Sequence, residues 1–390
     1  MEGRPPPVEN KPPERSGYSQ LMKIRKAKCC GHSFLNKQTR KERKFVLGRR
    51  VEEYRPILDL HMKSALQILE EYKGGVEAEI ERYVPRSGEP QEFYAPVWDL
   101  LGRGGKRIRP VMVLLASESV GGRREEAIGA AAAVELLHNM TLVHDDIEDQ
   151  SELRRGKPCI HITYGIPTAI NVGDAMLIKV FEIANQSKIP PDRCNRLVAQ
   201  VAKRAYDITW GQAYEFSMWK RKEVREDEVI RLLRNKTGAL TALSTEAGAI
   251  AGGGTEEQIK LLGDFGETIG IGFQIIDDVL NVSGDVKEYG KEIGGDIREG
   301  KKTILVAHVL GNAAAKDRRA FARILGKKNI TKTEIRKAIQ LYEKYDAIGY
   351  ARARAEAYLH SALETLKKLP PSQSRENLAS IAEFLVCRTY

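Results

Sequence analysis

The chain has 390 residues, of which 42% are hydrophobic and 30% charged, enough apolar material to bury a sizeable core in one large domain or two smaller ones. Its net charge of +10 belongs to the first 50 residues, which carry 14 Lys and Arg against 4 Glu, whereas the other 340 hold 49 basic and 49 acidic residues. The net charge of residues 51–390 is therefore zero and does not indicate a nucleic-acid partner.

The sequence also limits the compartment and the membrane contact. No run of 18 or more apolar residues exists, so we expect no transmembrane span and at most peripheral membrane contact. The five cysteines are odd in number and scattered, which indicates reduced thiols and a cytoplasmic location. Cys29 and Cys30 with His32 resemble a fragment of a zinc site, but no second pair of ligands completes it.

The first 50 residues differ in composition from the rest. They are rich in Pro and then in Lys and Arg, a composition that cannot bury enough apolar surface to offset its ordering entropy. We expect a basic, disordered extension over 1–50 and a single domain over 51–390. A basic arm, an organellar targeting segment and a translated leader ahead of a start at Met62 all fit the extension.

From Val51 onward, apolar residues recur with the period of a helix. Runs of alternating β-branched residues are almost absent, and no repeat of solenoid length is seen, so the predicted class is all-α, one domain of stacked helices. Helices are expected over 57–72, 127–137 leading into acidic residues, 168–185, 195–218, 226–250, 256–282, 301–311, 331–345, 347–366 and 376–387.

Two of these helices carry acidic pairs after an apolar approach. The first holds Asp145, Asp146 and Asp149, and on a helix Asp145 and Asp149 share one face. The second holds Asp277 and Asp278. Carboxylates crowded in this way favour Mg²⁺, which binds through one or two carboxylates together with substrate phosphates.

Basic residues gather near the ends of the same apolar helices. Arg side chains bind phosphate oxygens in a fork and Lys supplies a mobile point charge, so their repeated placement predicts one shared anionic ligand. They are Lys106 and Arg109 after a Gly-rich turn, Arg154 and Arg155 after the first acids, Lys236 beside Thr237, and Lys291 and Lys301 after the second acids.

At this point the sequence resembles the trans-isoprenyl diphosphate synthases, the farnesyl and geranylgeranyl diphosphate synthase type. The matching motifs appear in family order and cover about 60–390: Gly105-Lys106-Arg107-Ile108-Arg109-Pro110, Glu135-Leu136-Leu137-His138, Asp145-Asp146-Ile147-Glu148-Asp149, Leu153-Arg154-Arg155-Gly156, Lys236-Thr237, Phe273-Gln274-Ile275-Ile276-Asp277-Asp278 and Gly294-Gly295-Asp296. The resemblance implies a helical bundle around a deep central cavity, and a homodimer.

The resemblance also implies an activity: Mg²⁺-dependent condensation of isopentenyl diphosphate with allylic diphosphates. Three Mg²⁺ and the allylic diphosphate would be bound by the aspartate motifs, with metal ligands Asp145, Asp146, Asp149 and Asp277 and with Asp278 among the catalytic residues. Arg154, Lys236, Lys291 and Lys301 would assist. Isopentenyl diphosphate would be held by Lys106, Arg109, His138 and Arg155. Thr237 and Gln274 would line the allylic pocket, with Gln212 in support.

Two further expectations concern chain length and a departure from the family. Side chains one turn before the first acids point down the cavity, so Met140 and Thr141, with Leu137 a turn deeper, are expected to set product length. Because Met140 is bulky but pliable, we predict a geranylgeranyl (C20) product, with C15 and C25 products as the near alternatives. The second motif ends in Asn281 where the family usually has Asp, from which we expect weakened or retuned metal binding.

Other readings share parts of these motifs. The segment Gly295–Lys301 nearly matches a phosphate-binding loop but has Lys302 in place of Ser or Thr and follows a helix. His144-Asp145 fits a metal phosphohydrolase, which would want more histidine ligands. A class I terpene cyclase shares the acids but does not need Lys106 and Arg109. An inactive subunit that regulates a related synthase is the non-enzymatic alternative.

Overall fold

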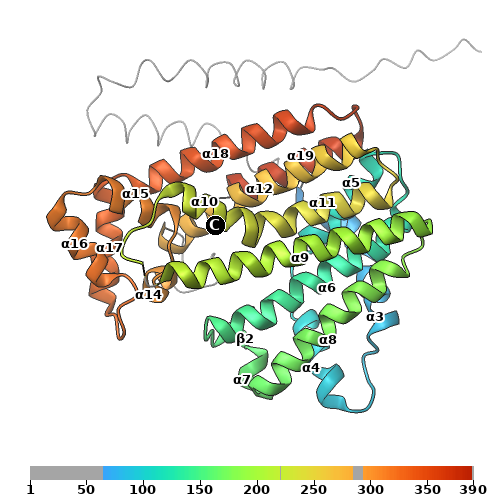
Figure 1. Cartoon of the computed structure of the whole chain (residues 1–390), viewed down its shortest axis with the longest axis horizontal. Coiled ribbons are helices and arrows are strands. Elements are labelled where there is room, and N and C mark those ends of the chain that lie inside the picture. The colour runs from blue at the N-terminus through green and yellow to red at the C-terminus, as the bar shows by residue number, and fades with distance from the viewer. Residues whose placement is uncertain (1–64, 220, 284–292, 389–390) are drawn as a thin grey trace, which may run out of the picture. The chain divides into compact units, whose positions relative to one another are not determined.

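The computed structural model describes residues 65–219, 221–283 and 293–388, and this part of the chain is almost entirely helical (Figure 1). The predicted all-α class is confirmed. The expected extension over 1–50, the Cys29–Cys30–His32 group, Met62 and Lys291 lie outside the described residues.

Residues 65–72 form the first described helix. The elements that follow are α3 (Val76–Tyr83), α4 (Gln91–Gly102), α5 (Ile108–Ser119), α6 (Arg124–Glu148), β1 (Leu153–Arg154), β2 (Lys157–Pro158), α7 (Ile160–Tyr164), α8 (Ile166–Asn185), α9 (Pro191–Trp219), α10 (Glu226–Leu233), the π-helical turn η3 (Arg234–Gly238), α11 (Ala239–Ala251), α12 (Glu256–Ser283), α14 (Gly295–Glu299), α15 (Ile304–Asn312), α16 (Ala315–Ile324), α17 (Lys332–Lys344), α18 (Ala347–Leu366) and α19 (Gln373–Cys387).

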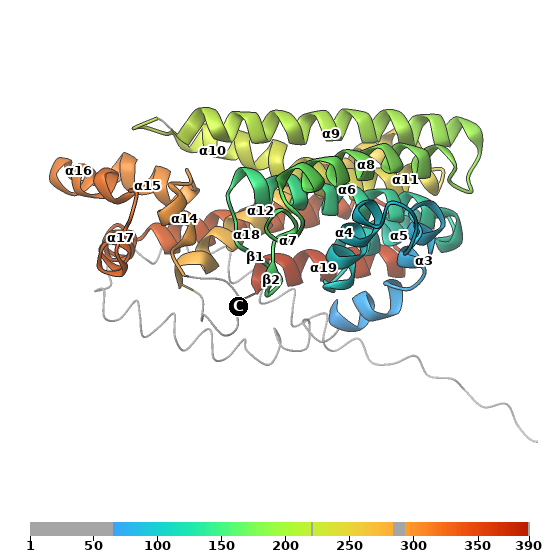
Figure 2. The same ribbon diagram turned by 90° about the horizontal axis from the view of Figure 1, so that it is seen from below.

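The centre of the core is α11, every residue of which is buried. It packs against α5, α6, α9 and α12, and Figure 2 shows α9 along one edge of the bundle with α18 and α19 toward the other. The approach of α12 is close, because a Cβ at Gly266 would lie 2.6 Å from the carbonyl oxygen of Thr241. Glycine is therefore required at that crossing.

The helix predicted over 226–250 is present, with one change inside it. It runs as α10, η3 and α11, and the π-helical turn covers Lys236 and Thr237. A π-helical turn inserts an extra residue into a helix and redirects the side chains that it carries, and such turns are frequent at functional sites.

Several elements were not predicted. They include the helices α3, α4, α5, α7, α14 and α16. The helix α15 begins at Ile304 rather than at 301, because the hydroxyl of Thr303 caps it by accepting the Val306 N–H at 3.4 Å. The two-residue hairpin β1–β2 was also missed; it is closed by Arg155 and Gly156, which have φ of 53° and 74°. Positive φ at both central residues is the geometry of the tightest hairpins.

Among the helices that the structure describes, none is both long and apolar enough to cross a membrane.

Candidate active site

The first acidic motif lies at the C-terminal end of α6. The helix is buried through most of its length and ends at Asp149, whose N–H donates to the carbonyl of Asp145 at 2.8 Å. Asp146 faces elsewhere: it is only 2% exposed, and the guanidinium of Arg154 donates to its carboxylate, with Nε 3.0 Å from Oδ1. Asp146 is thus committed to an arginine, while Asp145 and Asp149 face the lysines described below.

The hairpin separates the two adjacent arginines of the Arg-Arg pair. Arg154 is in the strand and faces Asp146. Arg155 is at the turn, where its Nη1 donates to the carbonyl of Gly104, and a Cβ at Gly105 would lie 3.2 Å from its Nη2. The turn therefore directs one arginine to the acids and the next to the Gly-rich turn before α5.

Lys236 joins the first acids to α9. Its Nζ lies 2.6 Å from Oε2 of Glu215 and 3.9 Å from Oδ1 of Asp145. Burial opposes the charge on Lys236, but Asp145 and Glu215 together raise its pKa above the ordinary value. Burial raises the pKa of Asp145 to about 6, and Lys236 works against that rise.

A chain of contacts leads from Lys236 to the second acidic motif. The hydroxyl of the neighbouring Thr237 donates to Oε1 of Gln274 at 3.0 Å, and Nε2 of Gln274 donates to Oδ1 of Asp278 at 3.0 Å. Asp278 is buried, and burial followed by the negative charge of Asp296 raises its pKa well above the ordinary value. Thr237 and Gln274, predicted as neighbours, are in contact.

The two acidic helices also meet through Lys301, whose Nζ lies 3.3 Å from Oδ2 of Asp149. Burial opposes the charge of Lys301, but Asp149, Asp296 and Glu299 raise its pKa well above the ordinary value. Asp277, the first acid of the second motif, accepts from Nη2 of Arg388 at 2.8 Å. The acids and lysines predicted from distant parts of the sequence therefore lie at one place.

Two of the predicted isopentenyl-side residues, Arg109 and His138, meet two helical turns before the acids of α6. Nη1 of Arg109 lies 3.4 Å from Nε2 of His138. Burial lowers the pKa of Arg109 to about 10, and burial followed by Arg109 lowers that of His138 well below the ordinary value. Burial, and then Arg388, lowers the pKa of Lys106. Such depression is expected of cations that are crowded together and short of a counter-charge.

Buried polar atoms without a partner show where ligands belong. Among the described residues they include Oδ1 of Asp149, Oδ2 of Asp278 and Nε of Arg109. An orphaned buried carboxylate oxygen costs free energy unless a cation binds it, and an orphaned guanidinium N–H costs free energy unless an anion accepts from it. The acids therefore suit a cation, and the arginine suits an anion.

The described residues contain no group of three His, Cys, Asp or Glu side chains already assembled around one metal. Mg²⁺ in phosphate-handling sites takes one or two carboxylates and completes its shell with substrate phosphates and water. The carboxylate oxygens of Asp145, Asp149 and Asp277 therefore fit Mg²⁺ that binds together with a diphosphate.

Residues predicted to set the product length lie inside the same helix. Leu137 is fully buried and Met140 is 8% exposed. Thr141 is half-buried, and its hydroxyl donates to the carbonyl of His138 at 2.8 Å. A small cavity of about 30 Å³ lies beside Arg109, Met112 and Phe273.

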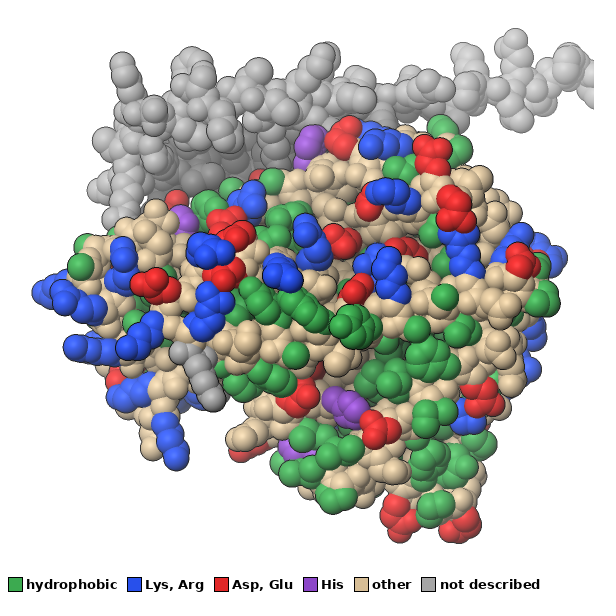
Figure 3. All heavy atoms as spheres, in the orientation of Figure 1, with side chains coloured by type: hydrophobic (Ala, Val, Ile, Leu, Met, Phe, Trp, Pro, Cys, Tyr) green, Lys and Arg blue, Asp and Glu red, His purple; other side chains and the backbone are tan. Residues whose placement is uncertain are grey.

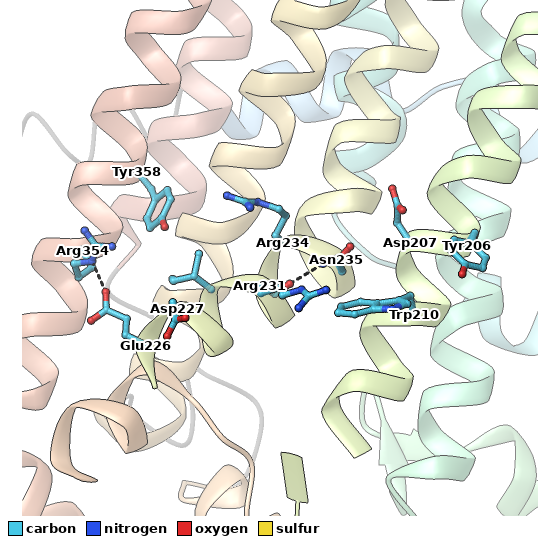
Figure 4. A pocket seen from close by; sticks show the side chains of 11 residues that line it. Tyr206, Asp207, Trp210, Glu226, Asp227, Arg231, Arg234, Asn235, Arg354 and Tyr358 are labelled. Atoms are coloured by element: carbon cyan, nitrogen blue, oxygen red, sulfur yellow. Dashed lines mark hydrogen bonds and ion pairs between the residues drawn. The ribbon is translucent and has the colours of Figure 1, made fainter. Parts of the chain in front are cut away.

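A larger hollow, of about 950 Å³, lies elsewhere, between α9, α10 and α18 (Figure 4). Its cations already have partners: Nε of Arg354 lies 2.9 Å from Glu226, and Nε of Arg234 lies 2.9 Å from Glu267. None of the predicted site residues lines this hollow, although Arg234 is in the same π-helical turn as Lys236.

Several site residues were not predicted from the sequence. Glu215, which holds Lys236, comes one turn after the predicted Gln212, whose Nε2 donates to Glu148 at 2.7 Å. Arg388, next to the last described helix, gave no local signal. Arg107, inside the Gly-rich motif, donates to Glu135 at 2.8 Å and so links the Gly-rich turn to α6.

Comparison with known proteins agrees with this geometry. Residues 90–342 match the polyprenyl synthetase family. The chain belongs to the polyprenyl synthetase family. It is therefore a prenyltransferase with the all-α fold of these synthases.

Relatives of this polyprenyl synthetase family member cover most of its length. A short chain isoprenyl diphosphate synthase from Methanothermobacter thermautotrophicus is 41% identical over 291 residues, which are 75% of this chain and 89% of the relative. The crystal structure of a geranylgeranyl pyrophosphate synthetase from Pyrococcus horikoshii matches with a TM-score of 0.79 and 40% identity, over 84% of this chain and 98% of that chain. A polyprenyl synthase from Caulobacter crescentus, solved with calcium and isoprenyl diphosphate, matches with a TM-score of 0.77 and 27% identity, over 84% of this chain and 98% of that chain.

Proposed function

We propose that this chain condenses isopentenyl diphosphate with an allylic diphosphate and releases a short-chain all-trans prenyl diphosphate, namely geranylgeranyl diphosphate. One observation carries the proposal: an acid-and-lysine cluster and a separate cluster of buried cations short of counter-charge flank the end of α6. The first suits a diphosphate bound through a metal and the second suits a diphosphate bound directly.

On the allylic side, Asp145, Asp149 and Asp277 would hold Mg²⁺, with three ions expected, and Asp146 would act mainly by orienting Arg154. When bound, Mg²⁺ would supply Lewis-acid stabilisation of the negative charge on the departing diphosphate. Arg154, Lys236 and Lys301 keep their charges when buried because acids raise their pKa. They are therefore in place to stabilise the same charge without reorganisation.

On the isopentenyl side, Lys106, Arg109 and Arg155 would bind the second diphosphate. His138 would be neutral, because its pKa is well below the ordinary value, and would donate or accept a hydrogen bond rather than add charge. The C–O bond of the allylic diphosphate would break first, leaving inorganic diphosphate and an allylic cation, and the double bond of isopentenyl diphosphate would then attack that cation. The departed diphosphate would take the proton that is lost. Buried Leu137 and Met140 would help exclude water from the cationic intermediate.

The product length follows from Met140, buried one turn before the acids, and the names of relatives support it. The Methanothermobacter relative is named for short chains and the Pyrococcus structure for geranylgeranyl pyrophosphate. A side chain of intermediate size, neither aromatic nor small, fits a floor at about twenty carbons.

A homodimer is supported by the exposed face of α8. Ile166, Ile170 and Ile178 lie on one stripe of this helix and are 50%, 45% and 68% exposed. Figure 3 shows hydrophobic side chains gathered over the front of the molecule, where α8 and α9 lie. A stripe of this kind on a helix surface fits a second copy of the chain.

The test is a product analysis of the purified chain alone, with Mg²⁺, isopentenyl diphosphate and each of dimethylallyl, geranyl and farnesyl diphosphate. Geranylgeranyl diphosphate from all three, abolished by EDTA, is the expected result. A hydrocarbon formed without isopentenyl diphosphate would indicate a cyclase. No turnover by the chain alone, with stimulation of a related synthase, would indicate a regulatory subunit.

A further inference from the structure

Asn281 stands one helical turn after Asp278 on α12, at the position where the resemblance predicts a metal-directed acid. It is only 6% exposed. Its Oδ1 accepts from the backbone N–H of Asp296 at 3.2 Å, and its own carbonyl accepts from the N–H of Gly294 at 2.8 Å. Two hydrogen bonds therefore fasten the start of α14 to the second acidic helix.

The segment fastened in this way carries Lys301 to the first acidic motif. The carbonyl of Asp296 accepts from the N–H groups of Gly300 and Lys301, both at 3.0 Å. Nζ of Lys301 then lies 3.3 Å from Oδ2 of Asp149. An unbroken series of contacts thus runs from Asn281 on α12 to Asp149 at the end of α6.

The same segment carries Asp296 to the second acidic motif. Oδ2 of Asp278 is buried and has no partner among the described residues, which points to a bound cation. Asn281 is one turn after Asp278 on α12, so the backbone N–H of Asp296 that it binds lies beside the second acidic motif.

We propose that Asn281 is a positioning residue: by accepting the N–H of Asp296, its side-chain oxygen sets the places of Asp296 and Lys301 around the allylic diphosphate. What position 281 requires is an acceptor oxygen and not a negative charge. Asparagine therefore serves where the family usually has aspartate. This inference rests on the proposed function for the identity of the bound diphosphate.

The test compares Asn281→Leu, of nearly the same size but without the acceptor, with Asn281→Asp, which keeps the acceptor. Mg²⁺-dependent binding of inorganic diphosphate is measured by calorimetry, and KM is measured for both substrates. Asn281→Leu is expected to weaken diphosphate binding and to raise the allylic KM by about 10-fold, the usual effect of losing an outer-shell partner. The KM for isopentenyl diphosphate should change less than about twofold, because the Arg109 cluster does not rest on α14.

Asn281→Asp is expected to keep the affinity of the native chain. In a Lys301→Ala background, Asn281→Leu should lower the affinity less than it does in the native chain, because the part of its effect that acts through Lys301 is already lost. Asn312→Leu, at an exposed asparagine on α15, is the matched control. If the Leu variant does not fold, Asn281→Gln moves the same amide by one methylene and is read in the same way.

Unchanged diphosphate affinity in Asn281→Leu or Asn281→Gln overturns the proposal. It is also overturned if Asn281→Asp and Asn281→Leu weaken diphosphate binding equally. Full additivity of the losses of affinity caused by Asn281→Leu and Lys301→Ala overturns it as well. Failure of the proposed function gives a different result: the native chain would form no prenyl product. The comparison of diphosphate affinities among the variants would still test the role of Asn281.

Discussion

The carboxylates of this site differ in pKa, and therefore in their ability to bind a metal at acidic pH. Burial raises the pKa of Asp145 to about 6, although Lys236 opposes the rise. A carboxylate must lose its proton to bind a metal. The affinity of the site for Mg²⁺ therefore depends in part on the protonation of Asp145.

We predict that acidification through pH 6 lowers the affinity of the native chain for Mg²⁺ with inorganic diphosphate by up to about tenfold per pH unit more than it lowers that of Asp145→Asn. The sign follows because protonated Asp145 predominates only below its raised pKa, whereas protonation of the diphosphate itself affects both chains equally. Calorimetric titration of both chains between pH 5 and 8 measures the difference. An equally steep fall in Asp145→Asn would assign the titration to another group.

Met140→Ala is predicted to lengthen the product beyond twenty carbons, because it removes a buried side chain one turn below the acids. Met218→Ala, at a fully buried methionine on α9, should leave the length unchanged. Each should cost about 2–5 kcal/mol of stability, so stability does not distinguish them. Mass spectrometry of the products measures the chain length. An unaltered product would show that Met140 does not limit product length.

At the scale of elements, the contact between α9 and the π-helical turn holds Lys236 in place. A Cβ at Gly211 would lie 2.7 Å from the backbone nitrogen of Lys236, so α9 and η3 touch through their backbones. Neither backbone can give way as a flexible side chain would. The position of Lys236 therefore depends on a glycine in another helix.

Gly211→Ala is predicted to lower kcat by about 10- to 100-fold and stability by about 1–3 kcal/mol, because it pushes η3 away from Asp145. Gly311→Ala is the control: it lies in α15, and a Cβ there meets nothing within 4 Å. That variant should be neutral or slightly stabilised. Steady-state kinetics and urea denaturation measure both, and equal activity in the two variants would contradict the prediction.

Arg107 is the second element-scale case, since it ties the turn before α5 to α6. It is 7% exposed and donates to Glu135, to Glu77 and to the carbonyl of Leu101. Arg107→Met is predicted to cost about 3–5 kcal/mol, because it leaves the carboxylate of Glu135 buried without its cation. Urea denaturation measures the loss; the exposed pair of Arg123 and Glu126 provides a control that should change little.

For the whole molecule, the exposed isoleucine stripe of α8 predicts assembly. Ile170→Glu should convert a dimer into a monomer in analytical ultracentrifugation, because it would bury two unpaired carboxylates at a symmetric interface. Leu66→Glu, an equally exposed apolar residue outside α8, should leave the dimer intact. A dimer that survives Ile170→Glu would place the interface on another face.

The sequence by itself determined the helical class, most helix boundaries and the residue types of both acidic motifs. These depend on local periodicity and on neighbours within a turn or two. It also indicated that Thr237 and Gln274 share a pocket, through resemblance and not through spacing. The helix α16 and the hairpin were missed because α16 is short and strongly polar and the hairpin has two residues in each strand.

Only the tertiary structure decided which partner each charge takes. Asp149 meets Lys301 from 152 residues away, and Asp277 meets Arg388 from 111 residues away. It also showed Asp146 facing an arginine and Asn281 holding a backbone N–H. These partners could not be predicted from the sequence. The charge of a side chain determines which kind of group it attracts, but the packing of distant helices determines which group lies close enough to bind.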